Sequence, residues 1–322
     1  MEYRLLGRTG VKVSSLCFGT MPFGGDADRE TSRAMFDRCR EVGINFFDCA
    51  NVYSQGAAEE ILGDLIQDCR DEVVLTSKVW GVVGDDINAR GLSRRHIMQA
   101  VEDSLRRLKT DRLDLYFLHN YDPETPMDEP LQALDDLQRQ GKILYPAISN
   151  WSAWQTAKAL GKAERNGWAA PVCLQPMYNL VKRQAEVEIL PLAESEDLGV
   201  ITYSPLGGGL LTGKYGVTER PSSGRLVDNP MYGKRYEAAQ NFSTAEAFVQ
   251  HAQEHDCHPV SLAVAWVMAH PAVTAPIIGA RSVEQLEASL AAVDVAMTPE
   301  WRDAISALSP TPPPATDRSE AQ

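Results

Sequence analysis

Short apolar runs alternate with longer segments of helical periodicity along most of this chain. Behind Ser93, a residue type that favours helix N-termini, Ile97, Val101 and Leu105 recur at helical spacing. This pattern predicts helices most clearly over Ser93–Leu108, Met127–Gln140 and Ala185–Asp197. The apolar runs predict eight strands, at Leu16–Gly19, Asn45–Cys49, Val73–Lys78, Leu113–His119, Ile143–Ser149, Val172–Met177, Val200–Tyr203 and Thr274–Ile278.

Strand and helix alternating eight times favour a (β/α)8 TIM barrel over an open, doubly wound sheet. No GxGxxG motif follows any predicted strand, so the usual dinucleotide fingerprint of open sheets is missing. In a barrel, all strand C-termini surround one mouth, and polar residues there indicate a site. Such residues are Asp48, Lys78, His119, Ser149, Asn150, Gln175, Tyr203 and Ser204.

Three segments fall outside the strand–helix repeat. Arg4–Val13 resembles a hairpin that turns at Arg8-Thr9-Gly10, and we expect it to plug the bottom of the barrel. Gly207–Asn241 shows little periodicity and predicts a long loop that covers a cofactor. We expect one domain over 1–309 and a disordered Pro-rich tail over 310–322.

Composition narrows the function classes. The 322 residues include 31 basic and 44 acidic side chains, and 31 − 44 gives a net charge of −13, which disfavours nucleic acid as a partner. No apolar stretch of about 18 residues predicts a membrane span, and the N-terminus lacks the apolar core of a signal peptide. Six scattered cysteines without a CxxC pair predict buried free thiols and a cytoplasmic protein.

Four residues at the predicted mouth suit carbonyl reduction or alcohol oxidation. Asp48, Lys78 and His119 each end a strand, and Tyr53 follows Asp48 by five residues. A carboxylate keeps a neighbouring lysine charged, and a charged lysine lowers the pKa of a neighbouring tyrosine, which favours proton exchange with an alkoxide. His119 can donate a hydrogen bond that orients the substrate oxygen. Taken singly, Asp48 and Lys78 also fit an ordinary ion pair, and His119 fits a satisfied core histidine.

The Asp-x4-Tyr, SKV and LHN elements at these positions resemble the catalytic tetrad of the aldo-keto reductases. The similarity runs from Arg4 to about Ser289, and the chain looks closest to a bacterial branch that also resembles potassium-channel β subunits and glyceraldehyde or methylglyoxal reductases. The resemblance implies Tyr53 as general acid-base, tuned by Lys78 and Asp48, with His119 orienting the carbonyl. It also implies NADPH/NADP+ as cofactor, with NADH as a weaker alternative.

The residues expected at the nicotinamide include side chains that can satisfy a carboxamide. Ser149, Asn150 and Gln175 supply donors and acceptors, and the Tyr203 ring can stack on the nicotinamide. For Ser149 and Gln175, a hydrogen bond within the barrel rim is the alternative interpretation. The resemblance adds cofactor contacts from Asp48 and from Gly19-Thr20-Met21, which closes the first strand.

The phosphate side is expected after the seventh strand. Gly208-x4-Gly213-Lys214 matches GxxxxGK, but Tyr215 stands where a nucleotide-hydrolysing P-loop needs Ser or Thr for magnesium. Backbone amides and Lys214 can still hold a pyrophosphate. The family pattern in this segment implies cofactor contacts from Ser204, Leu206, Gly208 and Lys214, to which Arg225 adds charge.

The adenosine side is expected after the last strand. A helix beginning near Ser282 offers its N-terminus to phosphate, and Arg281 is placed to pair with a ribose 2′-phosphate. A solvated helix-start charge is the alternative interpretation of Arg281. The resemblance implies contacts from Gly279, Arg281 and Gln285. Relatives often have Glu-Asn shortly after that glutamine, where this chain has Ala288-Ser289, which weakens the expected adenine recognition and NADPH preference.

The substrate pocket and the histidines are harder to place. We expect a small carbonyl substrate against Phe23, Tyr53, Trp80, His119 and Trp151. His251 and His255 stand four apart on a predicted helix, but no carboxylate or cysteine set joins them, so we predict surface histidines and no metal.

The function predicted from the sequence is NADPH-dependent reduction of aldehydes and some ketones. Three alternatives stay open: a sugar or alcohol dehydrogenase working in the oxidative direction, a cofactor-binding regulatory subunit with little turnover, and a barrel hydrolase or isomerase that uses His119 with a carboxylate. The oligomeric state is not predicted.

Overall fold

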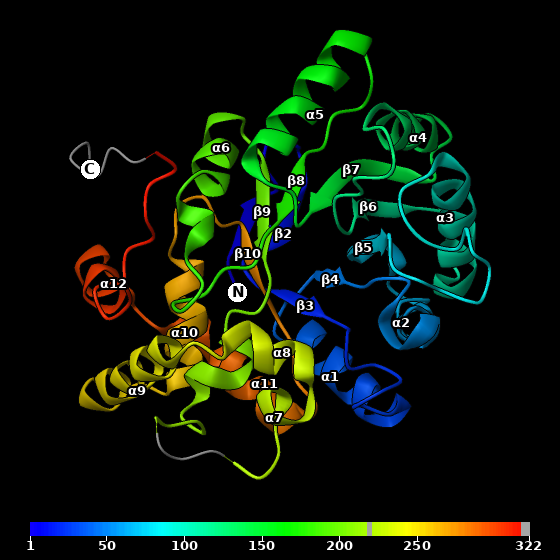
Figure 1. Cartoon of the computed structure of the whole chain (residues 1–322). Coiled ribbons are helices and arrows are strands. Elements are labelled where there is room, and N and C mark those ends of the chain that lie inside the picture. Colours follow the sequence, from blue (N-terminus) through cyan, green and yellow to red (C-terminus); the bar gives the residue numbers. More distant parts are fainter. Residues whose placement is uncertain (218–220, 317–322) are drawn as a thin grey trace.

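The computed structural model describes residues 1–217 and 221–316, and eight parallel strands in it close into a barrel (Figure 1). The strand order around the barrel is β10-β3-β4-β5-β6-β7-β8-β9, so the last strand closes on the first. The bounds are β3 Cys17–Gly19, β4 Phe46–Asp48, β5 Val74–Val79, β6 Leu113–Leu118, β7 Ile143–Ser149, β8 Cys173–Gln175, β9 Gly199–Thr202 and β10 Ala275–Ile278. The predicted TIM barrel is confirmed.

Helices cover the outside of the barrel (Figure 1). In α3, the Ser93 side chain accepts a hydrogen bond from the backbone N–H of His96, which is the N-cap that the sequence predicted. The longer helices are α1 Arg29–Glu41, α2 Ala57–Leu65, α3 Arg94–Leu108, α4 Asp128–Arg139, α5 Ala153–Asn166, α6 Ile189–Ser195, α9 Ala239–Glu254, α10 Pro259–Met268, α11 Val283–Leu290 and α12 Pro299–Ser306. The predicted helix over 185–197 is shorter than expected, because a separate 3-10 turn occupies Gln184–Glu186.

An N-terminal hairpin fills the end of the barrel opposite the mouth. Strands β1 (Tyr3–Leu5) and β2 (Lys12–Ser14) pair antiparallel, and Leu6 and Val13 lie fully buried in the apolar cluster inside the barrel. Close packing fixes the hairpin here, since a Cβ on Gly7 would lie 2.3 Å from the Gly199 backbone nitrogen. The expected plug is therefore present, and ligands reach the barrel from the other end.

The segment over 207–241 is not the structureless loop that its composition predicted. It forms a 3-10 turn over Gly207–Thr212, then α7 (Arg225–Asp228) and α8 (Pro230–Tyr236). Tyr236 is fully buried, so α8 is anchored by packing. Residues 218–220 of this segment lie outside the described residues.

The sequence also led to expectations for the C-terminal tail, the cysteines and membrane-spanning helices. Residues 310–316 of the tail form no helix or strand, and 317–322 lie outside the described part of the chain. All six cysteines are free, and four are buried; the other two, Cys69 and Cys257, are partly exposed, contrary to the expectation of buried thiols throughout. Across residues 1–217 and 221–316, the model contains no helix with the length and apolarity of a membrane span.

Candidate active site

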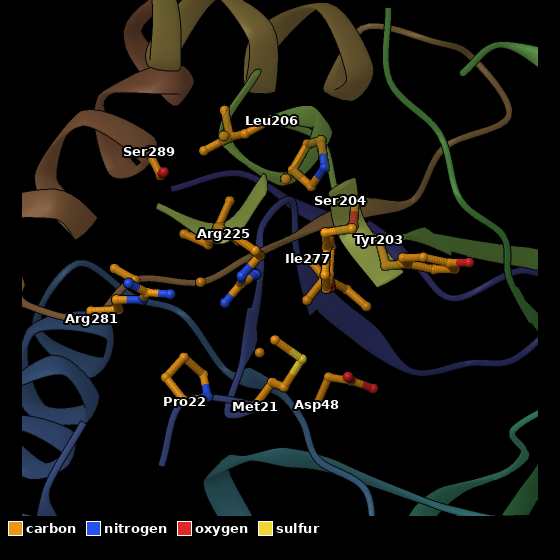
Figure 2. Close-up of a pocket in the computed structure, with 18 of the residues that line it drawn as sticks. Met21, Pro22, Asp48, Tyr203, Ser204, Leu206, Arg225, Ile277, Arg281 and Ser289 are labelled. Atoms are coloured by element: carbon orange, nitrogen blue, oxygen red, sulfur yellow. The ribbon is translucent and has the colours of Figure 1, made fainter. Parts of the chain in front are cut away.

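A cavity of about 1070 Å³ opens at the C-terminal ends of the barrel strands. Figure 2 shows its wall, with Asp48 at one end and Arg225 and Arg281 at the other. Its volume is at the upper end of the range for small-molecule sites. The predicted site residues that line it are Gly19, Met21, Asp48, Tyr53, His119, Ser149, Asn150, Gln175, Tyr203, Ser204, Leu206, Gly208, Lys214, Arg225, Gly279, Arg281 and Gln285.

A buried ion pair lies at the floor of the cavity. Lys78 Nζ is 2.6 Å from Asp48 Oδ2, and the two side chains are 0% and 3% exposed. The ammonium also donates to the Cys49 carbonyl oxygen at 2.7 Å, while Thr76 Oγ1 donates to Asp48 Oδ1 at 2.8 Å. Burial alone would lower the pKa of Lys78, but the Asp48 carboxylate raises it above its ordinary value. Lys78 therefore stays charged although water does not reach it.

Tyr53 sits directly above this pair. Lys78 Nζ donates a hydrogen bond to Tyr53 Oη at 3.3 Å, so the three residues form one connected unit. Burial nevertheless raises the pKa of Tyr53 to about 12, because desolvation of the phenolate outweighs the lowering by the Lys78 charge. The sequence argument predicted a net lowering, and that direction is wrong for the protein without ligand, since it omitted burial. The phenol is protonated at neutral pH and can act as a proton donor.

His119 faces Tyr53 across the cavity. The two rings meet edge to face, with centroids 6.2 Å apart. Burial and the Lys78 charge lower the pKa of His119 to about 3, so the imidazole is neutral at physiological pH. A neutral imidazole has one N–H donor and one acceptor, which suits it to hold a carbonyl oxygen by a hydrogen bond. It is not a source of protons there.

The four residues expected at the nicotinamide are hydrogen-bonded to the protein itself. Gln175 Nε2 donates to Asp48 Oδ1 at 3.0 Å, and Ser149 Oγ donates to the Gln175 carbonyl oxygen at 2.9 Å. Tyr203 Oη donates to Asn150 Oδ1 at 2.7 Å, and Asn150 Nδ2 donates to the His119 carbonyl oxygen at 3.0 Å. The structure thus brings the four together, but much of their hydrogen-bonding capacity serves the rim, as the alternative interpretation of Ser149 and Gln175 stated.

The opposite end of the cavity carries three cations, Lys214, Arg225 and Arg281. Burial and the charges of Arg281 and Arg225 lower the pKa of Lys214, which shows that the positive charges act on one another. The glycines before Lys214 allow this approach: Gly209 has φ +98°, and a Cβ there would lie 3.2 Å from Lys214 Cε. Such a cluster is stabilised by a ligand that carries several negative charges.

Four predicted contacts lie elsewhere. Thr20 is fully buried behind the wall, where its hydroxyl donates to the Asp48 carbonyl oxygen at 3.0 Å. Phe23 is fully buried in the core, because its ring packs against Phe18 at 5.8 Å. Trp151 is 5% exposed and packs edge to face on Tyr121, while Trp80 is 37% exposed. None of these residues, Thr20, Phe23, Trp80 and Trp151, is among the described residues that line the cavity.

The sequence analysis missed the cavity wall that α8 supplies. Tyr232 and Arg235 line the cavity, and the guanidinium groups of Arg225 and Arg235 each lie over the Tyr232 ring, at 5.2 and 5.0 Å from its centroid. The signal was present in the sequence, because Asn229-Pro230 is a typical helix start and the Asn229 side chain caps α8. Glycine and proline elsewhere in the segment obscured it.

The two histidines lie at the surface, as predicted: His251 in α9 is partly exposed, and His255, the C-cap of α9, is exposed. The rings of His251 and His255 lie 4.1 Å apart, and Trp301 Nε1 donates to His251 Nε2 at 2.9 Å. The Trp301 ring also stacks on His255 at 5.4 Å. Within residues 1–217 and 221–316, the model shows no group of three side chains suited to hold a metal ion.

The residues present fit a dinucleotide. Its phosphates need cations, which one end of the cavity supplies, and its reactive ring needs a rigid floor beside a proton donor, which the other end supplies. Strained backbone marks the stretch between, since Asn150 and Ser204 have φ of +59° and +58°. Such conformations cluster at ligand sites.

Comparison with known proteins agrees with this arrangement. Residues 15–309 match the model of the aldo/keto reductase family, so the chain belongs to that family. It is 38% identical over 324 residues to YrpG of Bacillus subtilis (strain 168), described as an uncharacterized oxidoreductase, and the match covers 97% of each chain. It is 36% identical to a probable voltage-gated potassium channel subunit beta of Oryza sativa subsp. japonica, with 98% of this chain and 99% of the relative covered. A protein of the same description from Arabidopsis thaliana is also 36% identical, over 92% of each chain.

Proposed function

We propose that this oxidoreductase uses NADPH to reduce aldehydes and some ketones to alcohols. The observation that carries the proposal is the Asp48–Lys78–Tyr53 unit at the floor of a cavity whose other end holds three cations. A nicotinamide cofactor bound between these ends would supply the hydride to the carbonyl carbon. The family membership and the relative described as an oxidoreductase support the same reaction class.

The residues of the chain then handle the carbonyl oxygen. His119 holds the oxygen by its N–H donor, and Tyr53 Oη gives up its proton as negative charge develops there. An alkoxide is a stronger base than a phenolate, so proton transfer from Tyr53 is downhill even with a pKa of about 12. Lys78, 3.3 Å from Tyr53 Oη, stabilises the phenolate that remains, and Asp48 keeps Lys78 charged and in place.

The rim keeps hydrogen-bonding capacity for a ligand. Gln175 gives one Nε2–H to Asp48 and has a second N–H and its Oε1 for a carboxamide, while Asn150 Oδ1, which accepts from Tyr203, has a second lone pair. Their fixed positions keep such a contact close to Tyr53. We also propose a cytoplasmic setting, which the six free cysteines support.

A second candidate function comes from the relatives. Two plant proteins that this chain matches over most of its length are described as probable channel subunits, which favours a cofactor-binding regulatory protein with little turnover. Alcohol or sugar oxidation by the same residues in reverse is the third candidate, because Tyr53 is then the proton acceptor that Lys78 assists.

The test follows NADPH oxidation at 340 nm with a panel of small aldehydes and ketones. We expect turnover in the wild type, and a loss of about 10²–10⁴-fold in kcat for Tyr53→Phe without weaker cofactor binding. Tyr145→Phe is the matched control. Tyr145 lies in the N-terminal half of β7, where it pairs with Leu115, and it does not line the cavity.

Three outcomes separate the candidates. Turnover that survives Tyr53→Phe would contradict the proposed proton donor. Turnover only with alcohols and NADP+ would favour the oxidative direction. NADPH binding with negligible turnover in both directions would favour the regulatory protein.

A further inference from the structure

An ion pair engages one of the three cations at the Lys214 end of the cavity. Arg281 Nε lies 2.9 Å from Asp26 Oδ2, and the two side chains are 41% and 52% exposed. Asp26 belongs to the segment after β3 and Arg281 to the segment after β10, and these two strands are neighbours in the barrel. The pair therefore bridges two adjacent loops at the edge of the cavity.

Both partners are presented by well-held backbone. The Asp26 loop is closed by a hydrogen bond from the Gly24 N–H to the Ala27 carbonyl oxygen and another from the Ala27 N–H to the Pro22 carbonyl oxygen, each 2.9 Å. On the other side, the Arg281 N–H donates to Gln285 Oε1 at 3.2 Å. The carboxylate and the guanidinium thus face each other because the fold places them so.

A carboxylate in this position disfavours the negatively charged ligand that the cation cluster favours. Lys214, Arg225 and Arg281 gather at one end of the cavity, and in Figure 2 the side chains of Arg225 and Arg281 point toward one another. Asp26 neutralises one of these three charges. The closest contact of the pair is made by Arg281 Nε, and Arg281 also lines the cavity, so a ligand there meets a guanidinium that Asp26 already partners.

The two side chains match two forms of a ribose. A ribose 2′-phosphate pairs with an arginine, whereas an aspartate accepts a hydrogen bond from a ribose 2′-hydroxyl and repels the phosphate. Dinucleotide-binding proteins use one device or the other to choose between NADP(H) and NAD(H). In this protein an aspartate and an arginine, Asp26 and Arg281, are paired with each other at the same place.

We propose that Asp26 is a second determinant of cofactor choice, which lowers the preference for NADP(H) over NAD(H) that Arg281 provides. A 2′-phosphate has to displace Asp26 from Arg281 or bind beside its charge, whereas a 2′-hydroxyl can use Asp26 as an acceptor. This inference rests on the proposed function only in assuming that the cavity binds a nicotinamide dinucleotide.

The effect should be moderate and sensitive to salt. Because both side chains are about half exposed, water screens the charges, and we expect Asp26→Asn to tighten binding of 2′-phosphorylated ligands about five- to ten-fold. Ligands with a 2′-hydroxyl should bind equally well or more weakly. The gain should shrink at high ionic strength.

A matched control exists on the same two units of the barrel. Arg38 of α1 and Glu287 of α11 form an exposed ion pair at 2.6 Å, and neither residue lines the cavity. Glu287→Gln therefore also removes one negative charge and one ion pair between the same two neighbouring βα units. It should leave every ligand affinity unchanged.

The experiment measures binding by isothermal titration calorimetry with the full chain. The probes are adenosine 2′,5′-bisphosphate against 5′-AMP, and NADP+ against NAD+. Asp26→Asn should shift both ratios toward the 2′-phosphate, and Arg281→Gln should shift both the other way. If Asp26→Asn changes the affinities for the 2′-phosphorylated and the 2′-hydroxyl probes by the same factor, Asp26 only holds the two loops together, and the inference is wrong. Unchanged affinity ratios in Arg281→Gln would also overturn it.

The readout separates this inference from the proposed reaction. A chain that binds the dinucleotides with the expected ratios but turns over no carbonyl would overturn the reaction and leave the role of Asp26 standing. Carbonyl reduction with unchanged ratios in Asp26→Asn would overturn the role of Asp26 alone. If none of the four probes binds to the wild type, both proposals are wrong.

Discussion

Two lysines in the cavity region show how differently its two ends are built. Lys78 is fully buried and its pKa is raised, because Asp48 lies 2.6 Å away. Lys214 is partly exposed and its pKa is lowered, by burial and by the charges of Arg281 and Arg225. The same side chain is therefore satisfied within the protein at one end and surrounded by like charge at the other.

This difference separates the proposed catalytic end of the cavity from the proposed phosphate-binding end. At the Lys78 end, the partners come from neighbouring strands, and the charges are balanced before any ligand arrives. Such preorganisation suits a proton donor whose position must not change. At the Lys214 end, repulsion from Arg281 and Arg225 persists beside the Asp26–Arg281 pair, and a bound anion would relieve it further, which suits a phosphate-binding site.

The largest effect expected is on stability, from Lys78→Met. Removing the ammonium leaves the buried Asp48 carboxylate without its cation, and we expect a loss of about 3–5 kcal/mol in the free energy of unfolding. Urea unfolding measures it. The double variant Asp48→Asn, Lys78→Met should recover much of that loss, because neither charge is then buried alone. If Lys78→Met is as stable as the wild type, Asp48 does not depend on Lys78 for charge balance, and the contrast between the two ends is lost.

The next effect concerns His119 at the proposed catalytic end. Its pKa is about 3 in the folded protein against about 6.5 when unfolded, so between these values the unfolded chain binds more protons and stability falls as pH falls. At pH 5 this amounts to about 2 kcal/mol. His119→Asn should therefore lose about 2 kcal/mol less than the wild type in the free energy of unfolding between pH 7 and pH 5.

A second histidine provides the control for this pH effect. Burial lowers the pKa of His270 to about 4, so His270→Asn should also reduce the acid sensitivity of unfolding. His270 packs against Tyr178 and does not line the cavity, so carbonyl reduction should be impaired only in His119→Asn. Identical pH dependence of stability in wild type and His119→Asn would contradict a neutral, desolvated imidazole.

The smallest effect expected is at the phosphate end, from Lys214→Met. Loss of this cation should weaken binding of adenosine 2′,5′-bisphosphate about ten-fold and reduce its salt dependence. Unlike Lys78→Met, it should leave the free energy of unfolding unchanged or raise it, because it removes like-charge repulsion. Calorimetry and urea unfolding on the same preparations compare the two lysine variants directly. If Lys214→Met lowers the free energy of unfolding as much as Lys78→Met does, the two lysines do not differ in how they are held in the fold.

The sequence by itself determined the barrel and the residues of the proposed catalytic cluster. Apolar runs alternating with helical segments specify parallel strands because each βα unit buries its apolar face in the same way, so the repeat is visible locally. Asp48, Lys78 and His119 were found for the same reason, since each stands at a strand end and parallel strand ends converge. The hairpin was equally local, with short strands around one turn.

Only the tertiary structure decided how each side chain is used. Trp80, Trp151 and Phe23 were placed in the pocket by residue type, but none of them lines the cavity: Phe23 packs on Phe18 and Trp151 packs on Tyr121. The direction of the Tyr53 pKa shift depended on burial, which no local pattern shows. The Asp26–Arg281 pair joins residues 255 positions apart (281 − 26). Such contacts are set by barrel closure, which brings the last strand beside the first.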